Sequence, residues 1–374
     1  MLAMSTIPIM RPKLPSAERL VPYLRTIDSS RVYSNFGPLA RSFEDRLAAR
    51  LGLPGGTVTT VANATLGLTL ALAAQGARPG TLCAVPAWTF IASAHAATMA
   101  GLIPYFVDVD ADTWAISPDS ITAVIAAAPT PIGAVMPVVP FGRPIDSAAW
   151  DRFRSRTGLP VVIDAAAGFD AVTPGVTPVV VSLHVTKVIG VGEGGFVMST
   201  DTSLIRDIRT RSNFGFFGTR EAAMPAANAK LSEYHAAVGL AALDEWSEVR
   251  SEWIAVARAY RNALSDSNRL RFQGGFGQSW ITSTCVMDLA NSGTTQLESA
   301  LAKVGIETRR WWGNGAHTHA ATAAYPRTPV PATEALAKST IALPFFRDLP
   351  LDEIQRVVEC TLAAVDTLDA ESNR

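Results

Sequence analysis

Short apolar runs and longer segments with helical periodicity alternate along the first two thirds of the chain. Residues 58–61, 82–85 and 179–181 are runs of the length and composition that suit strands buried on both faces of a parallel sheet. Strands that alternate with helices predict βαβ units, and therefore an α/β fold whose large domain has a mostly parallel sheet flanked by helices. Strands are expected at residues 58–61, 82–85, 105–109, 134–139, 161–164, 179–183 and 196–200, and helices at residues 16–27 and 39–51 and onward from Ala64, Phe90 and Ser147.

The alternation stops near Leu240, where one long helical pattern covers residues 233–264. We place a domain boundary here, between an N-terminal arm with a large domain over residues 1–245 and a smaller C-terminal domain over residues 246–374. The smaller domain is expected to be α+β, because its strands and helices do not alternate as βαβ units. Its expected elements are a strand at 280–288, a helix at 296–304, a strand at 341–343 and a last helix at 351–368.

The length of 374 residues is enough for two domains with substantial cores. Charged residues make up 17% of the chain, below the ~25% of ordinary soluble proteins, so part of the surface is expected to be buried against a partner subunit. The net charge of -1 gives no basic surface for nucleic acid or anionic membranes. A ligand that carries phosphate would therefore have to be held by a local site.

Cysteine usage and hydropathy indicate a cytoplasmic protein. Cys83, Cys285 and Cys360 are far apart and have no paired spacing, so neither a disulfide framework nor a zinc site is predicted. Residues 1–15 lack the features of a signal peptide, and prolines and polar residues interrupt the apolar region 82–107. We therefore expect neither export nor a membrane span.

The stretch at residues 179–195, VVVSLHVTKVIGVGEGG, joins an apolar strand to a conspicuous lysine, Lys187. A lysine at the end of a buried strand, followed by a glycine-rich turn, is well placed for covalent chemistry. A surface lysine in a loop is the alternative. Gly190, Gly192 and Gly195 also spell G-x-G-x-x-G, but a short strand rather than a helix follows them, so a dinucleotide site is not expected.

Asp164 ends the apolar run at residues 161–163, where a carboxylate is costly unless a cation lies nearby. Lys187 follows the next strand-like run, so the two side chains are expected at neighbouring strand ends. They could form a structural ion pair. They also match the paired requirement of pyridoxal phosphate, whose ring nitrogen needs an acidic partner and whose carbonyl needs a lysine.

A phosphate site is predicted at residues 58–65, where a strand runs into a helix. Asn63 is a suitable N-cap, and the N–H groups of Ala64, Thr65 and Leu66 would point at an anion. An ordinary capped helix is the alternative. Ser182, on the strand before Lys187, would supply a hydroxyl from the opposite side.

Phe90 follows another strand end and could cover a flat ring by stacking, although an aromatic residue at such a position is more often part of the core.

Several motifs together resemble one family. They are Gly37-Pro38, V-P-x-x-T-F at 85–90, F-V-D-V-D at 106–110, D-A-A at 164–166, S-x-H-x-x-K at 182–187, G-E-G-G at 192–195, N-x-K-L-S-E at 228–233 and A-L-P at 342–344. In this combination the chain resembles the DegT/StrS family of pyridoxal-phosphate nucleotide-sugar aminotransferases, which have an aspartate-aminotransferase fold. The resemblance implies homodimers with shared active sites. It also implies that Lys187 forms the Schiff base with the cofactor, Asp164 faces the pyridinium nitrogen, Ser182 and Thr65 bind the phosphate, Phe90 stacks on the ring, and Asn228 reaches the phosphate of the neighbouring subunit.

Two positions depart from the family pattern. Ala167 stands where the family usually has a glutamine that bonds near the phenolic oxygen of the cofactor, so one cofactor contact is lost. Asn63-Ala64-Thr65 replaces the usual serine-glycine-threonine turn, which keeps the backbone donors. Family members that dehydrate sugars carry histidine in place of the lysine, so Lys187 points to amino transfer.

Arg309, Arg310, Trp311 and Trp312 form an unusual cluster before a glycine-rich segment. In the family this region lines the substrate cleft, where arginines could bind a carboxylate or diphosphate and tryptophans could stack on a base or sugar. A turn packed with aromatic residues is an equal alternative.

His184 is a candidate for contact with substrate or cofactor, although a histidine at a strand end is at least as often structural. His317 is a further candidate for substrate contact. No metal site is expected at residues 317–319, where spacing suggests no third ligand.

The expected activity is the conversion of a nucleotide-linked keto-6-deoxysugar, carried by dTDP, GDP or UDP, to an amino sugar with L-glutamate as donor, as in deoxyamino-sugar and O-antigen biosynthesis. One alternative is an aminotransferase for another substrate class. The other is a non-catalytic regulatory or binding descendant of the fold, which only Ala167 favours.

Overall fold

The computed structural model describes residues 6–265, 267–290 and 293–372. In this part of the chain a large sheet has the order β3-β2-β4-β5-β6-β7-β1, since two parallel bridges, Val135 to Val161 and Val138 to Asp164, join its two hydrogen-bonded halves. Every strand except β7 runs in the same direction, so the expected mostly parallel sheet is confirmed. The strands are β1 (Val58–Val61), β2 (Leu82–Pro86), β3 (Ile103–Val107), β4 (Ile132–Val135), β5 (Ile163–Asp164), β6 (Val179–Ser182) and β7 (Gly195–Met198).

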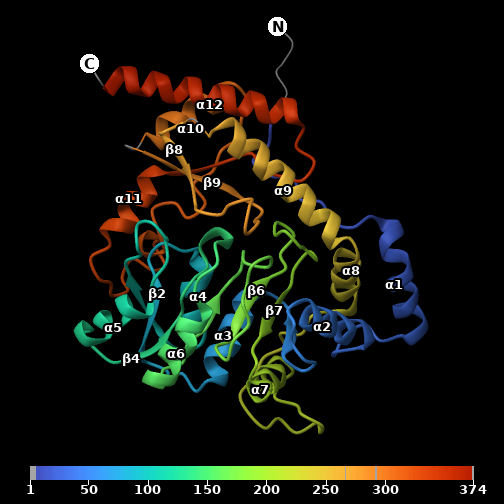
Figure 1. The fold of residues 1–374 in the computed structure, drawn as a ribbon. Coiled ribbons are helices and arrows are strands. Elements are labelled where there is room, and N and C mark those ends of the chain that lie inside the picture. Colours follow the sequence, from blue (N-terminus) through green and yellow to red (C-terminus); the bar gives the residue numbers. More distant parts are fainter. Residues whose placement is uncertain (1–5, 266, 291–292, 373–374) are drawn as a thin grey trace.

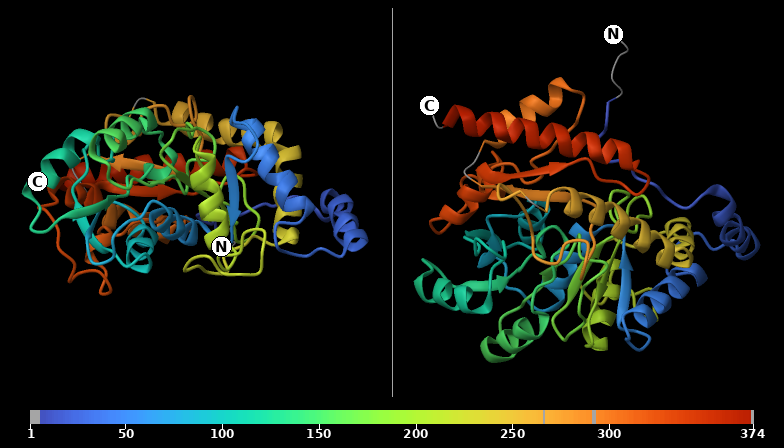
Figure 2. Two further views of the ribbon diagram at one scale, coloured as in Figure 1. Left: turned by 90° about the horizontal axis from the view of Figure 1, so that it is seen from below. Right: turned by 45° about the horizontal axis from the view of Figure 1, so that its top comes forward.

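Helices lie on both faces of the large sheet (Figures 1 and 2). One of them, α3, packs against β6 and β7. Gly67 permits this close approach, because a Cβ atom there would lie 2.9 Å from Val180 Cγ1. Among the described residues, no helix is both long and apolar enough to cross a membrane. The helices of this part are α1 (Ala17–Ser30), α2 (Pro38–Arg50), α3 (Ala64–Ala74), α4 (Ile91–Met99), α5 (Pro118–Ala127), α6 (Ser147–Thr157), α7 (Thr202–Ser212) and α8 (Glu233–Asp244).

The C-terminal part carries a second, antiparallel sheet of order β10-β9-β8, which lies across the upper edge of the large sheet in Figure 1. Helices α9, α10 and α12 pack together on its outer side. The elements are α9 (Trp246–Ala263), β8 (Leu270–Phe272), β9 (Cys285–Leu289), α10 (Thr294–Lys303), α11 (Pro331–Ser339), β10 (Thr340–Leu343) and α12 (Leu351–Ser372).

Two expectations for this part are wrong. The helical pattern at 233–264 forms two helices, α8 and α9, that meet at Glu245. The strand expected at 280–288 is confined to β9, because Gly277 N–H donates to Trp280 O (2.9 Å) and holds the preceding residues in a turn. The division of the chain into domains at residue 245 stays a prediction.

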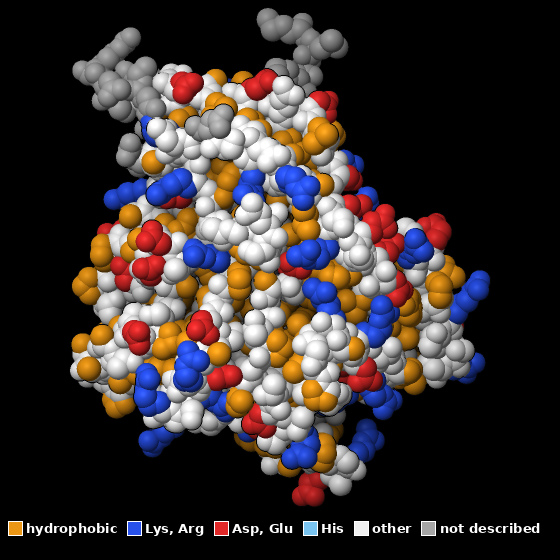
Figure 3. All heavy atoms as spheres, viewed as in Figure 1, with side chains coloured by type: hydrophobic (Ala, Val, Ile, Leu, Met, Phe, Trp, Pro, Cys, Tyr) orange, Lys and Arg blue, Asp and Glu red, His pale blue; other side chains and the backbone are white. Residues whose placement is uncertain are grey.

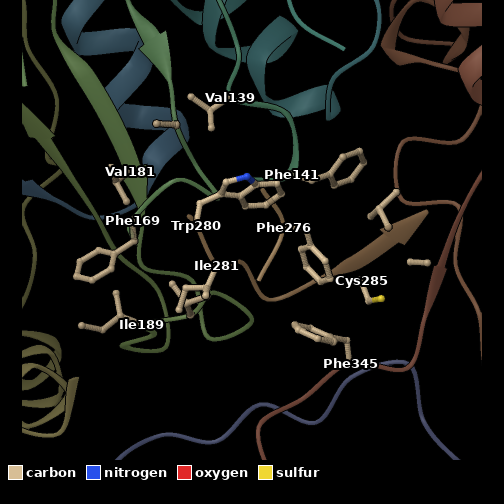
Figure 4. Packing of buried hydrophobic residues seen from close by; sticks show 14 of the residues in the cluster. Val139, Phe141, Phe169, Val181, Ile189, Phe276, Trp280, Ile281, Cys285 and Phe345 are labelled. Carbon is tan, nitrogen blue, oxygen red and sulfur yellow. The ribbon is translucent and has the colours of Figure 1, made fainter. Parts of the chain in front are cut away.

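One buried hydrophobic cluster extends through both parts of the molecule. Figure 4 shows Trp280 and Ile281 between Phe169 of the large part and Phe345 of the C-terminal part. Since the two parts share buried side chains, the C-terminal sheet is held in a fixed position over the ends of the parallel strands.

Glu233 is a fully buried carboxylate that begins α8 and caps a different helix, α2. Its Oε2 accepts a hydrogen bond from Leu39 N (2.7 Å) and its Oε1 accepts one from Ala40 N (2.9 Å). Gly37 leaves room for this contact, because a Cβ atom there would lie 2.7 Å from Glu233 Cδ. The negative charge of Glu233 at the N-terminus of α2 is stabilising. The same hydrogen bonds bring the motifs Gly37-Pro38 and N-x-K-L-S-E together in space.

We expect Glu233→Ala to lower the free energy of unfolding by about 3 kcal/mol, since each hydrogen bond to a charged group contributes about 1.5–3 kcal/mol. Glu233→Gln keeps one acceptor oxygen and should lose less. Urea unfolding at one protein concentration measures both, with the exposed Glu221→Ala as the control. Equal stability of Glu233→Ala and Glu221→Ala would contradict the capping role.

Candidate active site

The carboxyl ends of the parallel strands lie at one edge of the large sheet, facing the C-terminal part (Figure 1). In an open α/β sheet this edge is where ligands bind. Asp164 ends β5 and Ser182 ends β6, while Lys187 lies in the connection from β6 to β7. The order of the strands therefore brings together three of the residues predicted from sequence.

Asp164 is buried and held by two donors. Ser93 Oγ donates to Oδ2 (2.7 Å), and Ala166 N–H donates to Oδ1 (3.0 Å). Burial raises the pKa of Asp164, whereas Ser93, Ala166 N–H and the charge of Lys187 lower it. The two hydrogen bonds orient the carboxylate and support its ionised form.

Lys187 and Asp164 act on each other electrostatically. Burial lowers the pKa of the Lys187 amine, and the carboxylate of Asp164 raises it. The lysine is half-buried and lies in a turn, where its backbone N–H donates to His184 O (2.9 Å). A lowered pKa makes an amine more available as a nucleophile and as a base, so this lysine is suited to covalent chemistry.

The glycines of the G-x-G-x-x-G stretch serve the tight loop that carries Lys187. A Cβ atom on Gly190 would lie 2.9 Å from Val185 Cα, and Gly192 has a φ of +99°. Gly195 is the first residue of β7, so no helix follows. The structure thus confirms the short strand expected after these glycines.

The start of α3 forms a cradle with the end of β6. Gly195 is paired with both Val61 and Ser182, and a Cβ atom there would lie 2.9 Å from Ala64 N. The N–H groups of Ala64 and Thr65, in the first turn of α3, and the Ser182 hydroxyl thus lie close together. Donors at a helix start fit the phosphate of the cofactor.

The expectation that Leu66 offers a free N–H group is wrong. Asn63 is the N-cap of α3, and its Oδ1 accepts the hydrogen bond of Leu66 N (2.9 Å). The cap therefore uses one of the donors that the sequence suggested for an anion.

Phe90 and a hydroxyl relay lie at the end of β2. Phe90 is the N-cap residue of α4 and is 56% exposed, so its ring is available for stacking and is not part of the core. Thr89 Oγ1 and Ser93 Oγ lie 2.9 Å apart and lead to Asp164. Ser93 was not predicted from the sequence. It lies four positions after Thr89, a spacing that places both hydroxyls on one side of the start of α4.

Asn228 lies in the connection between α7 and α8, at the surface of the subunit. Its Oδ1 accepts a hydrogen bond from Lys230 Nζ (2.7 Å). The segment is fixed beside the start of α3, because Ala62 N–H donates to Ala229 O (2.7 Å). Ser232 is the N-cap of α8, and its side chain accepts a hydrogen bond from His235 N.

The cluster at residues 309–312 divides between two environments. Arg309 is exposed with its guanidinium over Trp311 (4.8 Å), and Arg310 Nε lies 3.8 Å from Glu298 on α10. Trp312 stacks on Phe141 (3.8 Å). Substrate contact by these four residues stays a prediction.

The two histidine candidates have protein partners. His184 Nδ1 lies 2.8 Å from Thr186 Oγ1, and its Nε2 lies 3.6 Å from Glu193. His317 is buried against Phe106, and burial lowers its pKa. In the described ranges no group of three or more metal-ligating side chains could hold a metal ion.

The architecture is that of the pyridoxal-phosphate-dependent aminotransferases. The chain superimposes on a putative PLP-dependent aminotransferase from Bacillus cereus with a TM-score of 0.89, at 28% identity, covering 96% of this chain and 100% of that one. It also matches DesI, solved in the presence of its TDP-sugar product, with a TM-score of 0.86 at 30% identity, covering 99% and 96%.

Within this class the chain belongs to the DegT/DnrJ/EryC1/StrS aminotransferase family, whose model matches residues 16–362. Protein Rv3402c of Mycobacterium tuberculosis is 31% identical, covering 94% of this chain and 88% of that protein. The dTDP-4-amino-4,6-dideoxy-D-glucose transaminase of Shigella dysenteriae is 30% identical over 69% of this chain and 70% of its own length. The protein is therefore an enzyme of the sugar aminotransferase family, with pyridoxal phosphate as cofactor.

Proposed function

We propose that this enzyme transfers the amino group of L-glutamate to a nucleotide-linked keto-6-deoxysugar in the cytoplasm. The observation that carries the proposal is the pair formed by the buried Asp164 and the half-buried Lys187, with the carboxylate fixed by Ser93. The relatives named for dTDP-sugar and TDP-sugar chemistry support the choice of substrate class.

The roles of the residues follow from their chemistry. Pyridoxal phosphate, when bound, supplies an electron sink that allows an amino group to be carried between two substrates. Lys187 would hold the cofactor covalently and move a proton at Nζ, and Asp164 would keep a proton on the ring nitrogen. The N–H groups of Ala64 and Thr65 and the Ser182 hydroxyl would bind the phosphate, and Phe90 would cover the ring.

Nucleotide-linked 3-keto and 4-keto-6-deoxysugars, each incubated with the enzyme and L-glutamate, test this function. Mass spectrometry should show the change from ketone to amine for at least one member of the panel. The Lys187→Ala variant is the control. Transamination between free amino and keto acids without any sugar product would favour the alternative substrate class. Absence of both reactions would favour a binding protein.

We further propose a homodimer in which each active site is completed across the interface. Large hydrophobic side chains are exposed on the segments near Asn228, including Phe214, Phe217 and Tyr234. A second copy of the chain would bury them, and the Asn228 amide could donate to a phosphate in the partner without adding a titrating charge.

Mixing an inactive Lys187→Ala subunit with an Asn228→Ala subunit should restore activity. The mixed dimer has one site with both defects and one with neither, so we expect about a quarter of wild-type activity when half of the dimers are mixed. Lys187→Ala mixed with Asp164→Asn is the matched control, because both residues belong to one subunit's site and no intact site can form. Recovery no greater than in this control would contradict the shared site.

A further inference from the structure

A crevice beside Lys187 is formed by segments that are far apart in the sequence: residues 10–13 of the N-terminal arm, the Lys187 turn and the segment after β10. Four of the residues that line it are basic, and no Asp or Glu of the described residues is among them. Two hydroxyl residues, Thr186 and Ser283, complete its polar lining. The cations are Arg11, Lys13, Lys187 and Arg347. Since opposite charges attract strongly where water is partly excluded, this crevice favours an anion.

Buried side chains and backbone hydrogen bonds hold the N-terminal arm in place. Ile7 and Ile9 are buried in the main hydrophobic cluster. Ile7 N–H donates to Gly305 O (2.8 Å), and Ile9 O accepts from Phe345 N (3.0 Å). Figure 4 shows the arm passing beside Phe345. The backbone that carries Arg11 is therefore held at the crevice.

Arg347, Lys13 and Arg11 differ in whether a carboxylate already lies near the charged group. Arg347 Nη1 lies 3.2 Å from Glu252, and its Nη2 donates to Lys13 O (2.7 Å), so it anchors the arm. Lys13 Nζ lies 4.0 Å from Asp348. Arg11 is exposed and has no carboxylate of the described residues within ion-pairing distance. Its guanidinium is the cation available to a ligand.

Lys and Arg side chains lie across the middle of the face shown in Figure 3, between the C-terminal part and the large sheet, with Asp and Glu side chains among them. The preference for an anion therefore rests on the residues that line the crevice.

We infer that Arg11 binds the carboxylate of the amino-acid donor, an inference that rests on the proposed function. The carbon that gives a proton to Lys187 Nζ carries this carboxylate as a direct substituent, so its partner must lie close to Lys187. The diphosphate of a sugar nucleotide is separated from the keto carbon by the sugar ring. The planar guanidinium can bind a carboxylate through two parallel hydrogen bonds.

Arg11→Gln tests the inference in the first half of the reaction, with L-glutamate and the cofactor-loaded enzyme but no sugar. The concentration of glutamate that gives half of the maximal rate of absorbance change should rise about 10- to 100-fold, since hydrogen bonds to a charged group contribute about 1.5–3 kcal/mol. The maximal rate and the KM for the sugar nucleotide should stay close to those of the wild type. Arg11→Lys should recover part of the loss, and Arg78→Gln, an exposed arginine before β2, is the matched control.

Calorimetric titration with succinate, an unreactive dicarboxylate, separates this inference from the proposed function. Succinate should bind wild type and Arg78→Gln equally and Arg11→Gln more weakly, even if the enzyme used a different donor. Unchanged glutamate dependence and unchanged succinate binding in Arg11→Gln would overturn the inference. A rise in the KM for the sugar nucleotide alone would also overturn it and would assign Arg11 to the diphosphate.

Discussion

Replacing Lys187 with alanine should abolish amino transfer. The fall is expected to be about 10⁴-fold or more, because the variant loses both the covalent attachment of the cofactor and a positioned acid–base group, which alone contributes about 10²–10⁴-fold. Burial lowers the pKa of the Lys187 amine, and the carboxylate of Asp164 opposes this shift by raising it. The yellow colour of the purified enzyme should be lost or shifted, and turnover with glutamate and a sugar nucleotide measures the rate.

Lys303→Ala is the control for this experiment, because Lys303 is exposed at the end of α10. Added methylamine should partly restore the activity of Lys187→Ala, since a free amine can take over the proton transfer at the same position. Turnover by Lys187→Ala at the wild-type rate without added amine would contradict the role of Lys187.

The parts of the site that could be predicted from sequence are local or follow from strand order. Asp164 ends one short apolar run and Lys187 lies in the connection that follows another, and parallel strands place such residues at one edge. Asn63 as the cap of α3 is a local signal as well, and the structure confirms it. For these residues the pattern within a few positions already carries the information.

The remaining features depend on contacts between residues far apart in sequence. Ser93 and Asp164 are separated by 71 positions, and Glu233 and Leu39 by 194. Arg11 reaches the crevice beside Lys187 because residues 305–307 and Phe345 bind the arm. No periodicity in the sequence reports such pairs, since tertiary packing decides which side chains meet.

The small errors in the expected elements have the same origin. β3 is Ile103–Val107 and not 105–109, because the Asp108 carboxylate accepts hydrogen bonds from Ala332 N (2.8 Å) and Thr333 N (2.9 Å) at the start of α11. The apolar pattern of the sequence continues to Val109, whereas the contact of Asp108 with α11 ends the strand at Val107. A polar residue that caps a distant helix is therefore easily taken for part of the strand that it follows.

Asp164→Asn should lower the rate of amino transfer by about 10²–10³-fold, the usual loss when one preorganised electrostatic partner of the reacting groups is removed. The amide keeps the shape of the side chain but cannot hold a proton on the ring nitrogen of the cofactor. Turnover and the visible spectrum of the cofactor measure the effect, with the exposed Asp119→Asn on α5 as the control.

Ser93→Ala then tests whether the ionised form of Asp164 is the active one. Ser93 Oγ donates to Asp164 Oδ2 and lowers the pKa of this carboxyl. Loss of that hydrogen bond raises the pKa of Asp164, so protonation begins at higher pH and the acidic limb of the pH–rate profile should move upward. At a pH well above this limb the variant should regain much of its activity, which Asp164→Asn cannot do. An acidic limb at the same pH in Ser93→Ala and wild type would show that Asp164 does not control it.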